Sequence, residues 1–144
     1  MSIKVNIYLN FKGECREAFS FYEKVFKSKI SFSSTYREEE EMKSIITNEE
    51  DLNKILHCYL PISDKTSLMG SDIIEGAGDP IIKQGNNVII ALVPDSEDET
   101  KRIFSELSAN GKILMPLEKT FWNSLYAMFT DKFGINWMVD YSYN

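Results

Sequence analysis

The feature that most constrains the fold of this chain is a repeat in the order of its predicted elements. A strand, a helix and three strands are followed by another strand, helix and three strands, although the two halves do not share residue identity. We therefore expect an α+β fold in which 1–144 is a single domain of two βαβββ modules, about 3–75 and 86–141. Each module leaves one sheet face uncovered, so the two curved sheets should pair around a cleft, where small ligands commonly bind.

The elements of the first module are predicted from changes in hydrophobic period. Ile3 to Phe11 alternates apolar and polar residues, as a strand with two different faces does. Glu14 to Lys27 places apolar residues at helical spacing, and Ser31 to Arg37 is typical of a second strand. Two further strands are expected over 54–62 and 66–74. The apolar stripe of the helix consists of Ala18, Phe19, Tyr22, Val25 and Phe26.

Two stretches of the first module could be mistaken for functional motifs. The segment Glu38 to Asn53 contains the runs EEEE and NEED, which indicate either a cation site or a solvated loop or short helix, and like-charge runs favour the latter. Gly76 to Pro80 is predicted to be a loop, because no helix signal follows it. A glycine-rich phosphate cradle requires a helix at that place, so nucleotide and S-adenosylmethionine sites are not expected.

The second module begins with a continuous apolar run. Val88 to Val93 predicts a strand that is buried on both faces. Asp95 or Ser96 can cap the helix that follows, and Ser96 and Glu99 have capping-box spacing. Gly111 should end that helix at its C′ position. A strand with Pro116 follows, and the proline indicates a sheet edge or a bulge. The buried stripe of the helix is predicted to be Thr100, Ile103, Phe104 and Leu107.

A β-hairpin is predicted to close the chain, over Thr120 to Tyr141. Its first strand includes Phe121, Leu125, Ala127 and Phe129. The run 131–134 supplies Asp and Gly where a turn needs local hydrogen bonds and a positive φ. After the turn, the larger apolar side chains alternate with smaller or polar ones, so one face should pack on a core and the other should face a smaller or wetter space. The core-facing stripe is Ile135, Trp137 and Val139.

Composition excludes several classes of function. The net charge of −6 argues against nucleic acid and against anionic membrane surfaces, because both are recognised by clustered Lys and Arg. No apolar run is long enough for a membrane span, and the N-terminus shows no signal-peptide pattern, so a cytoplasmic location is expected. Cys15 and Cys58 match neither a disulfide framework nor a zinc spacing, and we expect reduced, buried thiols.

Several short motifs, in their order and spacing, resemble one known superfamily. The chain is similar to the PhnB-like branch of the vicinal oxygen chelate superfamily, which holds glyoxalase I, bleomycin-resistance proteins and extradiol dioxygenases. This resemblance implies the paired βαβββ fold, a small-molecule ligand and a homodimer with clefts near its interface. The motifs that carry it are Tyr8-Leu9-Asn10-Phe11, Glu17-Ala18, Phe21-Tyr22, His57, Leu68-Met69-Gly70-Ser71-Asp72, Phe121-Trp122, Tyr126, and Asp131, Phe133, Gly134 and Trp137.

The resemblance also bears on metal. In the metal-dependent members, one ligand comes from each of the first, fourth, fifth and eighth strands. These positions correspond here to Asn6, to Met69 or Gly70, to Val88 and to Met138. A divalent site of this type needs imidazole nitrogens and carboxylate oxygens, which none of these residues provides. We therefore predict no metal and no other cofactor.

The single histidine is a candidate catalytic residue. His57 could act as a general base near neutral pH, with Asp72 at the end of the adjacent strand as its partner. The absence of an evident carboxylate partner in the sequence favours the alternative, a core or dimer-facing histidine bonded to a neighbour. Cys58 should face away from His57 by strand alternation, which argues against a Cys–His pair. The residues predicted to line the ligand site are Asn6, Tyr8, Asn10, His57, Trp122 and Met138.

Three functions are compatible with the sequence. The first is a protein that binds a small organic molecule without metal. The second is a metal-dependent lyase or dioxygenase relative that uses unrecognised ligands such as His57, Asp72 or Glu75. The third is a non-catalytic structural or interaction domain whose cleft is filled by side chains. Bound metal would distinguish the metal-dependent enzyme from the metal-free binding protein. An open, polar-lined cavity would distinguish the binding protein from the interaction domain.

Overall fold

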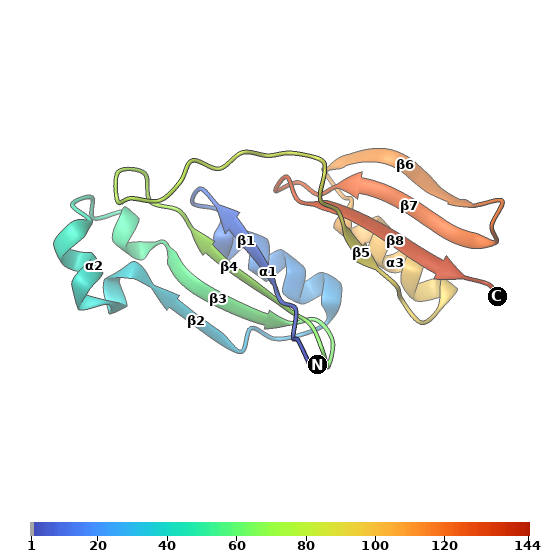
Figure 1. The fold of residues 1–144 in the computed structure, drawn as a ribbon, viewed down its shortest axis with the longest axis horizontal. Coiled ribbons are helices and arrows are strands. Elements are labelled where there is room, and N and C mark those ends of the chain that lie inside the picture. Colours follow the sequence, from blue (N-terminus) through green and yellow to red (C-terminus); the bar gives the residue numbers. More distant parts are fainter. Residues whose placement is uncertain (1) are drawn as a thin grey trace. The chain divides into compact units, whose positions relative to one another are not determined.

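The computed structural model describes residues 2–144 and divides the chain into two compact units. Unit 1 runs up to Lys83 and unit 2 from Gln84, and each is described here by itself. In Figure 1, α1 and α3 each lie behind the sheet of their own unit. No helix among residues 2–144 has the length and apolar character that crossing a membrane requires.

Unit 1 has the predicted order of strand, helix and three strands. Its sheet has the strand order β1-β4-β3-β2, in which β1 runs parallel to β4 and the other neighbours are antiparallel. Short helical segments fill the connection between β2 and β3. The elements are β1 (Ile7–Phe11), α1 (Cys15–Phe26), β2 (Phe32–Thr35), η1 (Tyr36–Glu38), α2 (Glu40–Ile45), η2 (Asp51–Asn53), β3 (Ile55–Pro61) and β4 (Ser67–Asp72).

The core of unit 1 lies between α1 and its sheet. The predicted apolar stripe of α1 is buried except for Phe26, which is half-buried, and the helix packs against β3 and β4. Gly70 permits this approach, because a Cβ atom there would lie 2.5 Å from the ring of Phe19. Leu9, Cys58 and Leu60 are buried with it on the same sheet face.

A buried carboxylate ties three segments of unit 1 together. Asp72 is 1% exposed, and its Oδ1 accepts hydrogen bonds from the main-chain N–H groups of Gly13 and Cys15, both at 2.9 Å. Its Oδ2 accepts one from the N–H of Ile55, also at 2.9 Å. The carboxylate therefore joins the start of α1 and the start of β3 to the end of β4, and it satisfies donors that would otherwise be buried without a partner.

The acidic segment is a short helix with flanking turns, which confirms the solvated interpretation. The glutamates of α2 are exposed, and Glu40 pairs with Lys43 at 3.1 Å. The segment is held by a small apolar cluster consisting of Tyr36, Ile46, Leu52 and Ile74. Tyr36 also donates a hydrogen bond from its hydroxyl to the main-chain oxygen of Asp72 at 2.7 Å.

Unit 2 repeats the order of strand, helix and three strands. Its sheet has the order β5-β8-β7-β6, with β5 parallel to β8, and α3 packs against β7 and β8. Ser96 caps α3 as predicted, since its hydroxyl accepts a hydrogen bond from the N–H of Glu99 at 3.1 Å. The elements are β5 (Ile90–Leu92), α3 (Glu97–Leu107), β6 (Lys112–Lys119), β7 (Ser124–Thr130) and β8 (Asn136–Ser142).

The turn of the closing hairpin is confirmed in detail. Asp131 Oδ1 accepts hydrogen bonds from the N–H groups of Phe133 and Ile135 at 2.8 and 3.1 Å, and Gly134 has φ +90°. Asp131 Oδ2 accepts a third from Trp137 Nε1 at 2.8 Å. Trp137 and Val139 are fully buried, as the stripe predicted, whereas Ile135 is half-buried.

Strand extents near the sheet edges differ from the predictions. The expectation that Val88–Val93 is buried on both faces is wrong, because β5 has three residues and Val88 and Val93 are 75% and 76% exposed. This strand lies at an edge and pairs only with β8. The first strand begins at Ile7 rather than Ile3, because its partner β4 begins at Ser67 and Ile7 lies opposite Leu68.

Two predictions about the chain between elements of unit 2 are also wrong. Gly111 is not the C′ residue of α3, which ends at Leu107, and Asn110 takes the left-handed conformation with φ +61°. Gly111 serves close packing instead, since a Cβ there would lie 2.1 Å from the main-chain oxygen of Thr130. Phe121 lies in the turn before β7 and is 97% exposed, so it belongs to neither strand nor core. Pro116 lies in the edge strand β6, where the register shifts, as expected.

Candidate functional site

The sheet face of unit 1 opposite α1 carries a row of large side chains, one from each strand. Tyr8 pairs with Met69, Met69 with Tyr59, and Tyr59 with Phe32. Paired neighbours share a sheet face, and Gly70 of β4 faces α1, so the row beside it points the other way. We call the side chains of Tyr8, Phe32, His57 and Tyr59 the aromatic face of unit 1.

His57 lies at the centre of the aromatic face. The centroid of its ring lies 5.7 Å from that of Tyr8, 5.7 Å from that of Tyr59 and 6.2 Å from that of Phe32. Its Nδ1 lies 3.4 Å from the hydroxyl oxygen of Tyr8. Depending on the tautomer, Nδ1 accepts a hydrogen bond from the Tyr8 hydroxyl or donates one to its oxygen. Among residues 2–144, no side chain bonds Nε2.

Asp72 is not the partner of His57, and this prediction is corrected. Alternation along β4 places Asp72 on the same side as Gly70, facing α1, whereas His57 belongs to the opposite face. Both oxygens of Asp72 accept main-chain N–H groups, so its carboxylate has a structural role. The register of β3 and β4 separates the two residues, since Tyr59 pairs with Met69 and Ser71 is therefore the β4 residue on the face of His57.

The cysteines are free thiols buried on the side of α1. Cys58 is 2% exposed, and burial raises the pKa of its thiol from 9.0 to about 11. Burial and the nearby Asp72 carboxylate raise the pKa of the Cys15 thiol well above its ordinary value. Both predictions for the cysteines are confirmed, and neither thiol is an accessible nucleophile.

Two asparagines of the N-terminal segment complete the polar groups of this face. Asn10 Oδ1 accepts a hydrogen bond from Ser71 Oγ at 3.2 Å. Asn6 Nδ2 donates to the hydroxyl of Tyr59 at 3.5 Å. The predicted residues Asn6, Tyr8, Asn10 and His57 therefore lie around one surface of unit 1. Tyr59 was not among the residues predicted to line the site, although its alternation with His57 along β3 places both on the same face.

The other two predicted ligand residues belong to unit 2. Met138 lies between Ala91 of β5 and Met128 of β7, on the face opposite Trp137. The ring of Trp122 contacts the ring of Tyr126, with their centroids 5.9 Å apart. Burial and the neighbouring Asp140 carboxylate raise the pKa of Tyr126. Trp122 and Met138 therefore both belong to unit 2.

The side chains at the superfamily's metal positions do not fit a divalent ion. Gly70 faces α1, which leaves Met69 as the residue on the aromatic face. Val88 lies outside β5, and the residue that pairs with Met138 is Ala91. A thioether, a methyl group and an amide are poor ligands for zinc or manganese. Within either unit, no three His, Cys, Asp or Glu side chains of residues 2–144 gather to hold a metal ion.

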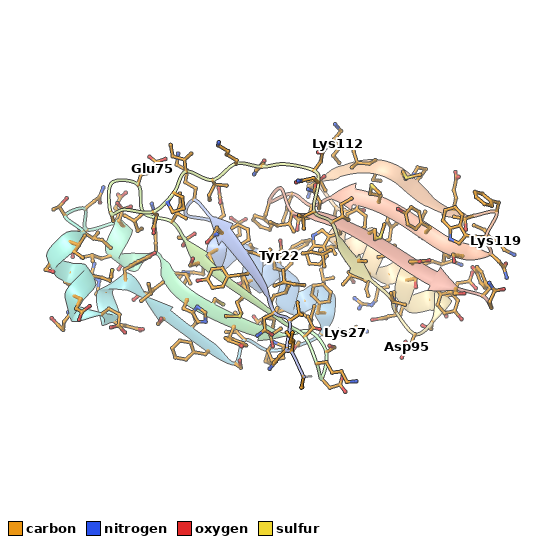
Figure 2. The ribbon with its side chains drawn as sticks, in the orientation of Figure 1. Tyr22, Lys27, Glu75, Asp95, Lys112 and Lys119 are labelled. Atoms are coloured by element: carbon orange, nitrogen blue, oxygen red, sulfur yellow. The ribbon has the colours of Figure 1, made fainter. Side chains whose placement is uncertain are left out.

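A separate hollow of about 530 Å³ lies at the C-terminal end of α1. It is lined by Ser20, Glu23, Lys24, Lys27, Ser28 and Lys29, and Figure 2 labels Lys27 there. Cations are favourable at a helix C-terminus, which accounts for the lysines. The hollow lies on the helix and the loop that follows it, so we assign it no part in the site on the opposite sheet face.

Comparison with protein families and curated proteins gives a consistent result. The model of the Glyoxalase/Bleomycin resistance protein/Dioxygenase superfamily matches residues 5–139. Protein YjdN of Escherichia coli (strain K12) is 32% identical over 143 residues, which cover 92% of this chain and 91% of that protein.

Solved structures show the same fold. Protein PA1353 from Pseudomonas aeruginosa superposes with a TM-score of 0.84 at 31% identity, over 98% of both chains. A PhnB protein from Bacillus cereus, described as a putative 3-demethylubiquinone-9 3-methyltransferase, gives 0.76 at 20% identity, over 97% of this chain and 100% of that one. The fosfomycin resistance protein FosX from Listeria monocytogenes, complexed with Mn(II) and sulfate, gives 0.60 at 14% identity, over 99% and 93%. The last two comparisons support the fold alone.

Proposed function

Because the chain belongs to the Glyoxalase/Bleomycin resistance protein/Dioxygenase superfamily, we propose that it binds a small organic molecule at the aromatic face of unit 1. We propose further that binding does not use the divalent metal of the superfamily's metal-dependent members. The observation that carries both statements is the set of side chains at this face. Three aromatic rings surround the only histidine, and the metal positions hold an amide, thioethers and a methyl group.

The aromatic face has the composition of an organic-ligand site. Ligand sites combine apolar ring surfaces with a few polar groups that orient the ligand. Tyr8 and Phe32 are 46% and 55% exposed, so their rings offer surface for stacking. The Tyr8 hydroxyl, the imidazole of His57 and the amide of Asn6 supply the polar groups. The prediction that Trp122 and Met138 of unit 2 also line the ligand cleft belongs to this proposal.

The metal-dependent alternative finds no support in the contacts of its candidate ligands. Both oxygens of Asp72 accept hydrogen bonds from main-chain N–H groups, and Glu75 forms an ion pair with Lys12 at 2.7 Å. His57 contacts Tyr8 and lies on the other side of the sheet from the Asp72 carboxylate. The three groups are therefore not assembled as a ligand set. We propose binding rather than a named reaction, since His57 has no carboxylate partner among the described residues of unit 1.

Thermal unfolding with added metals and compounds tests the proposal. We expect no melting shift with Ni, Zn, Mn, Fe or Mg, and a shift with some aromatic or amphipathic compounds. A ligand at about 100 times its Kd would stabilise the fold by about 2.7 kcal/mol. Tyr59→Ala should abolish the shift, whereas Phe121→Ala, which removes an exposed ring of unit 2, should retain it. Stoichiometric metal in untagged protein would restore the enzyme alternative, and failure of every compound would favour the interaction domain.

The proposal includes a homodimer. The strands β1 and β2 of one sheet and β5 and β6 of the other are edge strands, and exposed edges are usually covered. Ile113, Leu114 and Met115 of β6 are each between 45% and 50% exposed. Sedimentation should give about twice the chain mass of 16.6 kDa at micromolar concentration. A single species at the mass of one chain would refute the dimer without affecting the ligand proposal.

A further inference from the structure

Two polar groups beside the rings of the aromatic face have no hydrogen-bond partner. Among residues 2–144, His57 Nε2 and Ser34 Oγ form no hydrogen bond. Both side chains are half-buried, yet neither atom belongs to the buried polar side-chain atoms without a partner, which are Asn6 Oδ1 and Asp140 Oδ1. His57 Nε2 and Ser34 Oγ are therefore open to solvent, so that a ligand on this face can reach both.

The strand register places these two groups side by side. Ser34 of β2 is the direct partner of His57 of β3, and two residues further along the same ladder Phe32 is the partner of Tyr59. Side chains that are paired in this way share a face, with their Cβ atoms about 5 Å apart. The rings of Phe32 and Tyr59 adjoin the imidazole, at 6.2 and 5.7 Å between centroids. This part of the aromatic face therefore combines ring surface with two accessible polar atoms.

The charge of this surface limits what can bind there. None of the strand residues on this face is a lysine, arginine, aspartate or glutamate. An ionised ligand would lose hydration without gaining a counter-charge, which is costly, whereas a neutral ring loses little. The strand residues in question are Tyr8, Asn10, Phe32, Ser34, His57, Tyr59, Pro61, Ser67, Met69 and Ser71.

The two accessible groups match a ligand that offers a donor and an acceptor together. The Ser34 hydroxyl can both donate and accept, and His57 Nε2 donates or accepts according to the tautomer. A ring amide carries an N–H and a C=O on adjacent atoms. If Nε2 is unprotonated, the N–H donates to it and the C=O accepts from the serine. If Nε2 carries the proton, the two partners are exchanged, so a ring amide is satisfied in either tautomer.

We propose that the ligand of the aromatic face is a planar, uncharged ring with an adjacent N–H and C=O, and that His57 Nε2 and Ser34 Oγ bind these two groups. The ring of Phe32, which is 55% exposed, offers it a stacking surface. His57 and Ser34 then determine specificity, because a ring without the N–H leaves one of them without a partner. This inference rests on the proposed function, and it predicts a preference that stacking alone would not produce.

2-Quinolone and 1-methyl-2-quinolone test the inference, since they differ only in whether the ring nitrogen carries hydrogen or a methyl group. In NMR titrations of the unaltered protein, 2-quinolone should bind about tenfold more tightly, as loss of one hydrogen bond implies. His57→Phe, which keeps an aromatic ring, and Ser34→Ala should each reduce this ratio to about one. Ser33→Ala is the matched control, because Ser33 is the neighbouring serine on the other face of β2 and its loss should leave the ratio unchanged.

The imidazole nitrogens supply a second readout, which a purely structural role of His57 would not change. His57 is the only histidine of the chain, so its ¹⁵N signals are unambiguous in untagged protein. Saturation with 2-quinolone should change the ¹⁵N chemical shift of Nε2. Ser34→Ala provides a second variant if His57→Phe folds poorly, and it should not lower the melting temperature, because the hydroxyl that it removes has no partner among residues 2–144.

Three results would overturn the inference while binding of the two compounds still supports the proposed function. They are a ratio near one in the unaltered protein, a ratio that both His57→Phe and Ser34→Ala leave intact, and an Nε2 signal that does not move at saturation. Failure of both compounds to bind also overturns the inference, and the thermal screen with other aromatic compounds then tests the proposed function independently.

Discussion

The two units share a strand order and a helix position, yet they are stabilised in different ways. Unit 1 is anchored by Asp72, whose carboxylate joins main-chain groups up to 59 residues away in sequence. Unit 2 contains a buried aspartate at a different place, Asp131, whose hydrogen-bond partners Phe133, Ile135 and Trp137 lie within 6 residues. The repeated topology therefore does not require repeated anchoring interactions, because a different buried aspartate stabilises each module.

The sheet faces opposite α1 and α3 also differ, in the side chains that they carry. In unit 1, this face carries the histidine, two tyrosines and the Asn6 amide. In unit 2, it carries Met128, Met138 and Ala91 in one row, with Tyr126 and Asp140 in the next. The polar groups of unit 1 are thus uncharged side chains around an imidazole, whereas unit 2 combines an apolar row with a phenol and a carboxylate. This asymmetry is why our proposals centre on unit 1.

The largest expected effect comes from the long-range anchor. Asp72→Ala leaves three N–H groups without an acceptor, those of Cys15 and Ile55 in buried hydrogen bonds, and should destabilise the protein by about 5 kcal/mol. Asp131→Ala also removes three hydrogen bonds, but two of them belong to a local turn whose N–H groups water can reach, so we expect about 3 kcal/mol. Urea unfolding of both variants measures the difference. Equal losses in the free energy of unfolding would show that the long-range and the local hydrogen bonds contribute equally to stability.

The core of unit 2 should be nearly as sensitive. Trp137→Ala removes a fully buried indole that also donates to Asp131, and a loss of about 3–5 kcal/mol is expected. Trp122→Ala is the matched control, because this ring is 46% exposed and its loss should cost about 1 kcal/mol or less. A loss below 1 kcal/mol for Trp137→Ala would mean that this face of β8 is not packed, contrary to its burial.

Alkaline pH should affect unit 1 through its buried acids. Burial raises the pKa of Tyr36 from 10.0 to about 12, so the neutral phenol favours the folded state. Its contribution, about 2 kcal/mol, is complete below pH 10 and is lost as the pH rises towards 12. Cys58 acts in the same direction between pH 9.0 and about 11. In urea unfolding against pH, Tyr36→Phe should reduce the loss at the upper end of this range and retain the part due to the thiols of Cys58 and Cys15, whose pKa values burial also raises. An unchanged profile would contradict the assignment.

The smallest effect distinguishes the two helix ends. Lys27 follows α1 with φ +51°, and Asn110 lies in the loop after α3 with φ +61°. Lysine is disfavoured in this left-handed region, whereas asparagine tolerates it. Lys27→Gly should therefore stabilise the protein by about 1 kcal/mol, and Asn110→Gly by only a few tenths. Differential scanning calorimetry of the two variants measures the difference, and equal stabilisation by the two glycines would contradict it.

Local chemistry determined which parts of the fold could be predicted from sequence. The turn at Asp131 and the cap at Ser96 were predictable because their partners lie within four residues. The burial of Val88 was not, because it depends on β5 being an edge strand. Strand alternation was enough to place Tyr8 and Asn10 on one face of β1, whereas His57 shares that face only through the register of β1, β4 and β3. The contacts of Asn6 with Tyr59 and of Tyr8 with His57 bridge 53 and 49 residues, so only the folded register shows them.

The most direct test of the central claim is a map of amide chemical shifts in metal-free, EDTA-treated protein titrated with indole. Our account predicts saturable shifts concentrated in β1, β3 and β4 of unit 1, around Tyr8, His57 and Tyr59, with no change when Zn or Mn is added. Shifts that appear only with added metal, or that saturate elsewhere and leave these three strands unaffected, would contradict it.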